Sequence, residues 1–368
     1  MDVVIVNCFD TYEHRVDYIC DFFRKRGDRV KVYTSNFRHF EKKVRDDSKE
    51  GYIYIKAIPY YKNISVIRMV SHFKLSKDIF KCLKNETADL IWVLIPPNSF
   101  IKSIYKYKKR NAASKIVFDV IDMWPETFPI NKVEWIPLIK MWKNMRDKWI
   151  SKADFLITEC DLYQDKFNSI ISKNKVKTIY LAREIKPFTG KPNLPKDKLV
   201  LCYLGSINNI IDIPTIVNII NFFKKNLIVE LHIIGDGEKR EKLISEASGA
   251  GATVIYHGKV FDAEEKQKIF DTCHFGLNIM KDSVYVGLTM KSIDYFEAGL
   301  PIINNIHGDT WHFVEENKVG INVDGLGLVF SIDNLEIREK VRHFYEDKFG
   351  ISSFEQNLDY VVNDNLFM

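Results

Sequence analysis

The sequence is poor in cysteine, and its cysteines are scattered. Only 6 of the 368 residues are cysteine, and no two of them form a Cys-x-x-Cys pair. Most stand in apolar surroundings, which is typical of buried thiols. A secreted domain held together by disulfides would need a denser and more regular pattern. We therefore expect reduced thiols and a cytoplasmic protein.

Long apolar runs are missing as well. No run approaches the roughly 20 residues that a membrane-spanning helix needs. The short apolar run 3–6 follows Met1-Asp2 directly, without the basic segment and longer apolar stretch of a signal peptide. We expect this run to be the first strand of a sheet.

The sequence also lacks internal repeats of short period and low-complexity segments, but its charge is unevenly distributed. The net charge is +5, yet residues 1–190 carry 36 Lys and Arg against 23 Asp and Glu, and residues 191–368 carry 18 against 26. This split indicates two parts with different partners. The first part should favour anions. We expect no nucleic-acid partner, because an RNA role would rest on charge alone, without a motif.

What is present is a regular alternation of short apolar runs with helical patterns. In the first half we expect seven strands, at 2–7, 29–34, 51–57, 89–95, 115–120, 154–158 and 177–181. The helices between them are expected at about 12–26, 65–84, 98–111, 135–151 and 160–171. Apolar strands that alternate with helices are typical of a parallel sheet covered on both faces.

The alternation restarts after a linker at 186–196, which contains three prolines and a glycine. We expect six strands, near 199–204, 228–235, 252–256, 275–279, 301–304 and 319–323. Helices are expected near 212–225, 238–248, 262–272, 289–298 and 309–317, and a tail at about 334–364 reads as two helices with a break at Gly350. The sequence thus predicts an α/β chain of two tandem, doubly wound, Rossmann-like domains with a cleft between them.

The segment 287–304 carries the clearest chemistry. Thr289 can cap a short helix that Gly299 ends, and Lys291 and Asp294 are three residues apart, so they share one face near the helix start. A helix N-terminus favours phosphate. A cation for a diphosphate beside a carboxylate for a ribose diol suits a nucleotide-sugar site. The alternative is an ordinary surface ion pair.

Three strands of the second half run into glycine. Gly205-Ser206, Gly235 and Gly258-Lys259 follow the strands predicted near 199–204, 228–235 and 252–256. Glycine lets backbone N–H groups approach a phosphate, sugar or base closely. Each of these exits, taken alone, can also be a plain turn.

The order of these four segments resembles the C-terminal half of GT-B glycosyltransferases of the family 4 type. The resemblance implies that Asp294 holds the ribose, that Lys291 holds the diphosphate, and that Gly205 and Ser206 line the donor pocket. It further implies a retaining transferase that uses a nucleotide-diphosphate sugar, for which we expect a UDP-sugar. The family often has a glutamate eight residues before the ribose carboxylate, where this chain has Val286. Asp282 and Tyr285 are candidate substitutes.

In the first half, Asp122-Met-Trp-Pro-Glu126 resembles a segment of the same enzymes in which the position of Asp122 faces the cleft. Asp122 or Glu126 could orient the acceptor hydroxyl or act as the base. The alternative for Asp122 is a structural cap, with Trp124 and Pro125 as packing residues. His14 falls where the family has a loop over the acceptor, and its alternative is a solvated loop residue.

The family resemblance also sets the domain limits and the expected ligands. We expect an acceptor-binding domain over 1–185, a nucleotide-sugar-binding domain over 186–350, and a C-terminal helix within 351–368 that returns to the first domain. No Asp-x-Asp pair and no metal cluster occurs in the sequence, which disfavours the metal-dependent design. We expect no cofactor and no metal, only the donor and its UDP product.

The acceptor is expected to be a glycan, on a lipid carrier, in bacterial capsule or exopolysaccharide assembly. Cations alternate with bulky apolar residues at 60–74, 100–110 and 135–149, a composition that suits an anionic membrane surface but also the two faces of ordinary Rossmann helices. We expect peripheral contact with the inner face of the plasma membrane. Two alternatives stay open: a catalytically inactive GT-B-like partner of an active paralogue, and a nucleotide-sugar epimerase of similar shape.

Overall fold

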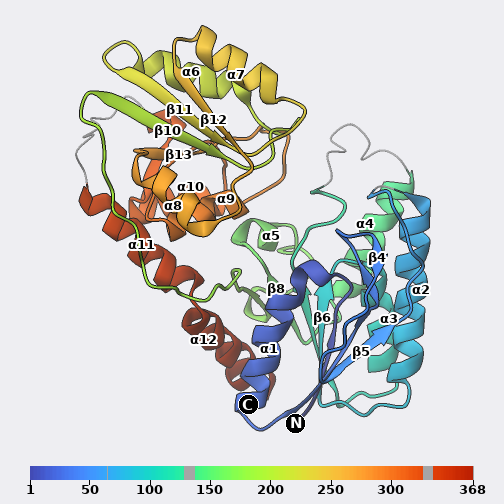
Figure 1. The fold of residues 1–368 in the computed structure, drawn as a ribbon. Coiled ribbons are helices and arrows are strands. Elements are labelled where there is room, and N and C mark those ends of the chain that lie inside the picture. Colours follow the sequence, from blue (N-terminus) through green and yellow to red (C-terminus); the bar gives the residue numbers. More distant parts are fainter. Residues whose placement is uncertain (64, 128–136, 326–334, 368) are drawn as a thin grey trace. The chain divides into compact units, whose positions relative to one another are not determined.

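The computed structural model describes residues 1–63, 65–127, 137–325 and 335–367 (Figure 1). The chain divides into two compact units. The first unit comprises Met1–Arg183 together with Ile351–Met368, and the second comprises Glu184–Gly350. The first residues of two predicted helices, 135–136 and 334, lie outside the described residues.

The first unit contains a parallel sheet of seven strands in the order β5-β2-β1-β6-β7-β8-β9. The strands are β1 (Asp2–Val6), β2 (Arg29–Ser35), β5 (Tyr52–Ile55), β6 (Leu90–Ile95), β7 (Lys115–Val120), β8 (Phe155–Thr158) and β9 (Val176–Thr178). The helices are α1 (Glu13–Lys25), α2 (Val66–Leu83), α3 (Ser99–Lys108), α4 (Pro137–Ile150), α5 (Asp161–Asp165) and α12 (Ile351–Val361), which a π-helical turn, Val362–Leu366, extends.

All seven strands predicted for the first half are present. Their central members are buried on both faces because helices cover the sheet. Two features differ from the prediction. A small antiparallel pair, β3 (Phe37–Arg38) and β4 (Lys43–Val44), is too short to give a periodic pattern, and α5 ends at Asp165 rather than near 171.

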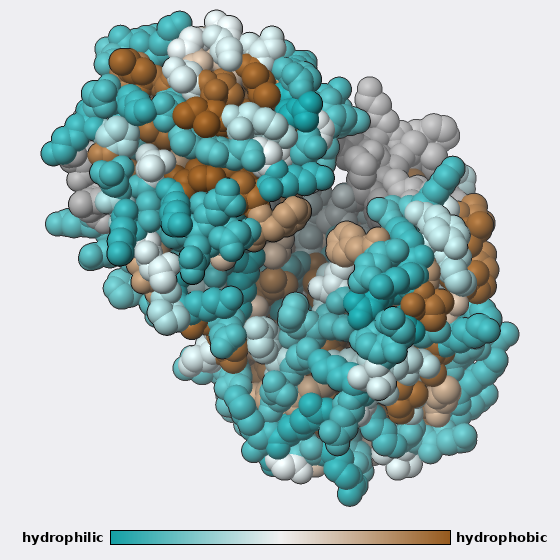
Figure 2. Space-filling model, viewed as in Figure 1, coloured by the Kyte–Doolittle hydropathy of each residue, from teal (hydrophilic) through white to brown (hydrophobic). Residues whose placement is uncertain are grey.

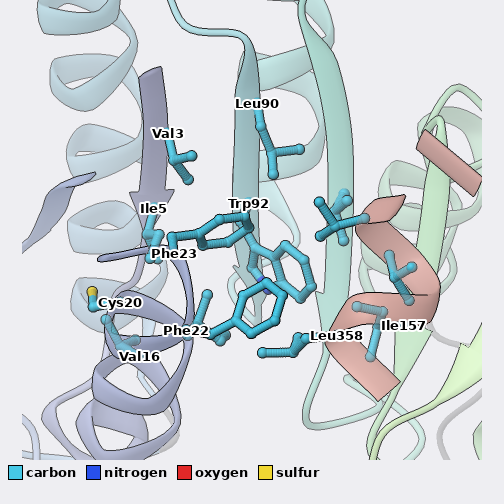
Figure 3. Packing of buried hydrophobic residues seen from close by; sticks show 14 of the residues in the cluster. Val3, Ile5, Val16, Cys20, Phe22, Phe23, Leu90, Trp92, Ile157 and Leu358 are labelled. Atoms are coloured by element: carbon cyan, nitrogen blue, oxygen red, sulfur yellow. The ribbon is translucent and has the colours of Figure 1, made fainter. Parts of the chain in front are cut away.

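The core of the first unit draws on both ends of the chain. Trp92 of β6 is fully buried between residues of α1, such as Phe23, and Leu358 of α12 (Figure 3). A charged pair lies within the same region. Arg15 binds both carboxylate oxygens of Asp119 at 2.9 Å, and the Trp92 indole donates to Asp119 at 3.0 Å. The returning α12 is therefore an integral part of this core.

The second unit contains a parallel sheet of six strands in the order β12-β11-β10-β13-β14-β15. The strands are β10 (Lys198–Leu204), β11 (Ile228–Ile234), β12 (Thr253–Gly258), β13 (Phe275–Asn278), β14 (Ile302–Asn304) and β15 (Gly320–Asn322). The helices are α6 (Ile213–Phe223), α7 (Arg240–Gly249), α8 (Ala263–Asp271), α9 (Met290–Glu297), α10 (Asp309–Asn317) and α11 (Leu335–Phe349). All six strands predicted for the second half are present.

Strand order reverses at one place in each sheet. In the first unit β1 lies between β2 and β6, and in the second unit β10 lies between β11 and β13. Ligands of doubly wound sheets bind beside such reversals, outside the carboxyl ends of the strands. The predicted fold class is confirmed for each unit, and the topology directs attention to the loops after β1, β6, β10 and β13.

Candidate active site

The N-terminal end of α9 is fixed by hydrogen bonds to other residues of the second unit. The Thr289 hydroxyl accepts a hydrogen bond from the backbone N–H of Ser292 at 3.2 Å and donates to the amide oxygen of Asn278 at 2.7 Å. Gly299 follows the helix with a φ of 64°. The predicted cap and the predicted glycine stop are both confirmed.

A buried row of asparagines, which was not predicted from the sequence, supports that cap. Asn278, Asn304 and Asn322 each end a strand, and they lie opposite one another in register. Asn278 donates to Asn304, and Asn304 donates to Asn322, both at 2.8 Å. The row fixes the carboxyl edge of three strands on which α9 begins. Asparagine at three successive strand ends was the signal that could have revealed it.

A tyrosine joins α9 to β10. The hydroxyl of the fully buried Tyr295 donates to the carbonyl of Cys202 at 3.0 Å and accepts the N–H of Leu204 at 2.7 Å. Its ring lies against Gly276, where an added Cβ would be 2.6 Å from the ring carbons. The helix that carries Lys291 and Asp294 is thus fixed to the strand that ends in Gly205-Ser206.

Lys291 is directed at the end of β10. Its ammonium nitrogen lies 4.6 Å from the ring centroid of Tyr203 and 3.5 Å from the Tyr203 hydroxyl. That hydroxyl donates to the carbonyl of Ser206 at 3.0 Å. Within the described part of the chain, Lys291 forms no ion pair with a carboxylate. Burial lowers the pKa of Lys291 to about 8, so this site holds a cation without a counter-charge.

The three glycine exits form one continuous edge. Gly205 donates its backbone N–H to the carbonyl of Ile234 at 2.9 Å, and Gly235 donates to the carbonyl of Gly258 at 2.7 Å. Gly235 has a φ of 137°, and an added Cβ there would lie 1.9 Å from the Gly205 oxygen. The close approach of these two loops therefore requires glycine at 235.

The structure brings most of the predicted donor residues to this edge of the second unit. Ser206 and Lys259 are exposed there, while Asp294 is half-buried on α9, one turn after Lys291. Val286, at the position where the family often has a glutamate, is half-buried, and Asp282 is exposed on the loop before α9. Tyr203 and Tyr295 were not predicted, since no local pattern distinguishes them from other strand and helix tyrosines.

In the first unit, Asp122 follows β7 and is held by its neighbours. Its two oxygens accept from the Trp124 indole at 2.6 Å and from the Thr127 hydroxyl at 2.5 Å. Burial raises the pKa of Asp122, and the hydrogen bonds from Thr127 and Trp124 oppose this rise only in part. A carboxylate of this kind is suited to accepting a proton or a hydrogen bond.

Asp122 lines a cavity of about 300 Å³ in the first unit. The other lining residues are aromatic, polar or cationic: Phe9, Thr11, Tyr12, His39, Phe40, Asn63, Arg68, Trp124 and Thr127. They come from the loop after β1, the segment around β3, the start of α2 and the loop after β7, which is the edge that the sheet topology indicates. The predicted residue Asp122 thus lies in a cavity with ring faces suited to a sugar.

The two other residues predicted as catalytic lie in different surroundings. Both oxygens of Glu126 accept from the buried Arg146, at 2.7 and 2.8 Å. Burial raises the pKa of Glu126, but the bonds and charge of Arg146 outweigh this and hold it below its usual value. His14 is exposed in the first turn of α1, next to the buried Arg15. Neither lines the cavity around Asp122, and their catalytic roles stay predictions.

Other features of the described residues concern metals, membranes and thiols. They include no group of three or more His, Cys, Asp or Glu side chains placed to hold a metal ion. None of their helices has the length and apolar character to cross a bilayer. All six cysteines are free thiols, and five of them are buried, Cys82 being the exposed one.

Comparison with known proteins relates the second unit to one family. Residues 198–347 match the family model of group 1 glycosyl transferases. No curated protein matches the chain in sequence. The family match covers β10 to most of α11, the part that contains Lys291, Asp294 and the glycine edge.

Solved structures resemble the whole chain at low sequence identity. The lipopolysaccharide outer core galactosyltransferase WaaB, in its apo form, aligns over 99% of both chains with a TM-score of 0.72 and 15% identity. Sucrose-phosphate synthase from Thermosynechococcus elongatus aligns over 99% of this chain and 98% of its own, with a TM-score of 0.65 and 11% identity. HepE of Anabaena, in complex with UDP-glucose, aligns over 99% and 100%, with a TM-score of 0.62 and 12% identity. These likenesses show the GT-B fold.

Proposed function

We propose that the chain, which has the GT-B fold and matches the family model of group 1 glycosyl transferases over residues 198–347, is a glycosyltransferase. It would move a sugar, with retention of configuration, from a UDP-sugar to a glycan hydroxyl. The observation that carries this proposal is the unpaired Lys291 of α9 beside the Gly205-Ser206 exit of β10. A cation without a counter-charge, next to exposed backbone at a strand end, suits a diphosphate. The structure of HepE with UDP-glucose supports the choice of donor.

The charged and the neutral residues of the proposed donor site have different roles. Lys291 and the N-terminal end of α9 offset the negative charge that develops on the leaving diphosphate. Asp294 accepts hydrogen bonds from the ribose hydroxyls. The backbone at Gly205, Gly235 and Gly258 approaches the diphosphate and the base closely. Activity should therefore persist when a chelator removes divalent cations.

The acceptor binds in the first unit. Asp122 accepts a hydrogen bond from the attacking hydroxyl and orients it, because it is the carboxylate that lines the cavity. Glu126 is the second candidate for this role, and its engagement with Arg146 makes it the less available carboxylate. His14 is the third candidate, as an exposed donor at the start of α1.

We place the acceptor glycan on a lipid carrier, in capsule or exopolysaccharide assembly, at the inner face of the plasma membrane. A solvent-facing apolar stripe on α2 supports this placement: Val66, Ile67, Val70 and Phe73 are 76%, 58%, 49% and 46% exposed. Hydrophobic surface is visible over α2 in Figure 2. Lys74, Lys77 and Lys81 continue the same helix. An apolar stripe flanked by lysines suits an anionic bilayer surface.

Vesicle flotation tests that placement directly. We expect the protein to float with vesicles of anionic lipid and not with neutral ones, and the double variant Ile67→Ser/Phe73→Ser to lose flotation. An exposed apolar residue elsewhere, Phe261 (89% exposed), provides the control Phe261→Ser, which should float normally. Equal flotation of all three proteins would remove α2 from the membrane contact.

The enzymatic proposal is tested with a panel of nucleotide sugars. Calorimetry with UDP should show binding, and a thermal-shift screen should single out one donor, because ligand binding stabilises the folded state. Release of UDP from that donor should rise when an acceptor extract is added. Absence of UDP binding would overturn the proposal.

The alternative is a catalytically inactive GT-B-like partner of an active paralogue. The observation in its favour is Val286, which occupies the position where the family often has a glutamate. Such a partner would bind UDP or a glycan and release no UDP from any donor, with or without acceptor.

A further inference from the structure

Arg68 is an exception among the buried arginines of this protein. Six arginines of the described residues are buried, and five of them pair with a carboxylate. These pairs are Arg15–Asp119, Arg45–Glu13, Arg146–Glu126, Arg338–Asp271 and Arg342–Glu346. Arg68 is 6% exposed and has no such partner within the described part of the chain. Its charge acts on the Asp122 carboxylate of the same cavity, where it opposes the rise in pKa that burial causes, but the two side chains form no ion pair. Burying a charge without an ion-pair contact costs several kcal/mol, so the position of Arg68 calls for an explanation.

The contacts of Arg68 hold its guanidinium without neutralising it. Its central carbon lies 4.5 Å from the ring centroid of Trp124 and 5.4 Å from that of Phe9. One terminal nitrogen donates to the carbonyl of Asn63 at 2.5 Å, while Nε is buried without an acceptor among the described residues. Ring faces and one carbonyl orient the group, and donor capacity remains.

Arg68 lines the same cavity as Asp122. A second cation, Lys42, lies nearby, since its ammonium nitrogen donates to the side chain of Asn63 at 2.6 Å. Trp124, which lines the cavity, stacks with the buried His72, the ring centroids being 5.9 Å apart at an interplanar angle of 24°, which fixes the indole beside the guanidinium. The cavity volume is at the lower end of ligand pockets, a size suited to one sugar residue.

We propose that the acceptor sugar carries an anionic group, a carboxylate or a phosphate, and that Arg68 binds this group while Asp122 binds the hydroxyl that is to be glycosylated. This inference rests on the proposed function and names the class of acceptor. An acid at one end of the sugar and a hydroxyl at the other match a cavity with a guanidinium and a carboxylate. Arg68 would then determine specificity for the acceptor, because a neutral acceptor sugar would leave the charge of Arg68 buried and unpaired.

Binding of simple acids tests the proposal without knowledge of the natural acceptor. With UDP at saturation, so that the donor site is filled, we expect glucuronate and glucose 6-phosphate to raise the melting temperature and methyl glucoside to have no effect. The two acids distinguish carboxylate from phosphate. Arg68→Met should weaken binding of the preferred acid about 10- to 150-fold, as for loss of a charge-assisted bond. Arg110→Met, an exposed arginine of the same unit, should leave it unchanged.

Two variants of Arg68 and the binding of a neutral sugar distinguish the possible results. The near-ultraviolet circular dichroism and tryptophan fluorescence of Arg68→Met should equal those of the wild type, which shows that the first unit is folded, because UDP binding reports only on the second unit. Arg68→Lys, which keeps the charge, should retain part of the acid binding. Binding of methyl glucoside as tight as that of both acids, or no acid binding by the wild type, would overturn the anionic acceptor. A protein that binds acids but not UDP would instead sink the proposed donor site and keep this inference.

Discussion

The ammonium nitrogen of Lys291 lies 4.6 Å from the ring centroid of Tyr203. Tyr203 belongs to β10 and Lys291 to α9, so the contact spans 88 residues of sequence. The same tyrosine donates to the carbonyl of Ser206. One ring therefore sets the position of the cation relative to the loop on which the proposed diphosphate rests.

Lys291→Met should weaken UDP binding about 10- to 150-fold, as expected for loss of a charge-assisted contact. Because burial lowers the pKa of Lys291 to about 8, the free wild-type protein loses this charge above pH 8. UDP affinity measured by calorimetry should be flat between pH 7 and 8 and fall, by up to tenfold per pH unit, above it. The exposed Lys268→Met on α8 is the control. A pH-independent affinity would contradict the assignment.

The same substitution should stabilise the free protein. At pH 7 Lys291 is charged in the folded and the unfolded state, and the folded state bears the desolvation cost. Its folded pKa lies below the unfolded value, so this cost diminishes as the pH rises from about 8 to 10.5. Lys291→Met should raise the free energy of unfolding at pH 7 by about 1–3 kcal/mol, while Lys268→Met changes it little. A loss of stability would argue that Lys291 is structural.

Gly235→Ala should destabilise the second unit by at least about 2 kcal/mol. The new Cβ would lie 1.9 Å from the Gly205 oxygen, at a φ of 137° that alanine rarely adopts. Gly249→Ala is the matched control. It ends α7 with open space around it, so it should be neutral or stabilising by up to about 1 kcal/mol. Chemical denaturation of the two variants measures the difference, and equal midpoints would contradict the close approach.

Asp122→Asn should lower turnover about 10²- to 10⁴-fold and leave UDP affinity unchanged. Asp122 must be ionised to act as the base or to accept the acceptor hydroxyl beside its bonds to Trp124 and Thr127, and its pKa is raised. Wild-type activity should therefore fall as the pH drops through that raised value. Thr127→Val removes a hydrogen bond to the ionised form, so the acid limb of its pH profile should move to higher pH. Full activity of Asp122→Asn would show that this carboxylate is structural.

Glu126→Gln should cost about 1.5–3 kcal/mol of stability, because it removes one of the two carboxylates that compensate the buried Arg146 and leaves only Asp147. The double variant Glu126→Leu/Arg146→Met removes both charges and should recover most of this loss. Denaturant unfolding measures both effects. A double variant that is folded and active would assign Glu126 a structural role, while a folded and inactive one would support its catalytic role.

The features that could be predicted from the sequence are those that depend on residues close together in the chain. Strand and helix positions follow from periodicity, and the Thr289 cap and the Gly299 stop follow from local turn chemistry, so these predictions were confirmed. Lys291 stood out because it is three residues from a carboxylate. Its actual neighbour, Tyr203, is distant in sequence and could not be identified by such spacing.

The remaining features depend on contacts across the sheets. The asparagine row requires the register of three strands, and the unpaired state of Arg68 is visible only when the partners of the other buried arginines are known. The orientation of side chains around a helix explains one further feature that was not predicted from the sequence. His14 and Arg15 are adjacent, yet the roughly 100° between successive helix residues exposes the first and buries the second against Asp119.

The return of α12 has a consequence for biosynthesis. The core around Trp92 includes Leu358, Val361 and Leu366, which leave the ribosome after the whole of the second unit. Residues 184–350 can fold as soon as they emerge from the ribosome. The first unit, in contrast, keeps part of its apolar core exposed until α12 has been synthesised. The second unit can thus be completed before the first, and a nascent chain arrested after Gly350 would have only its second unit folded.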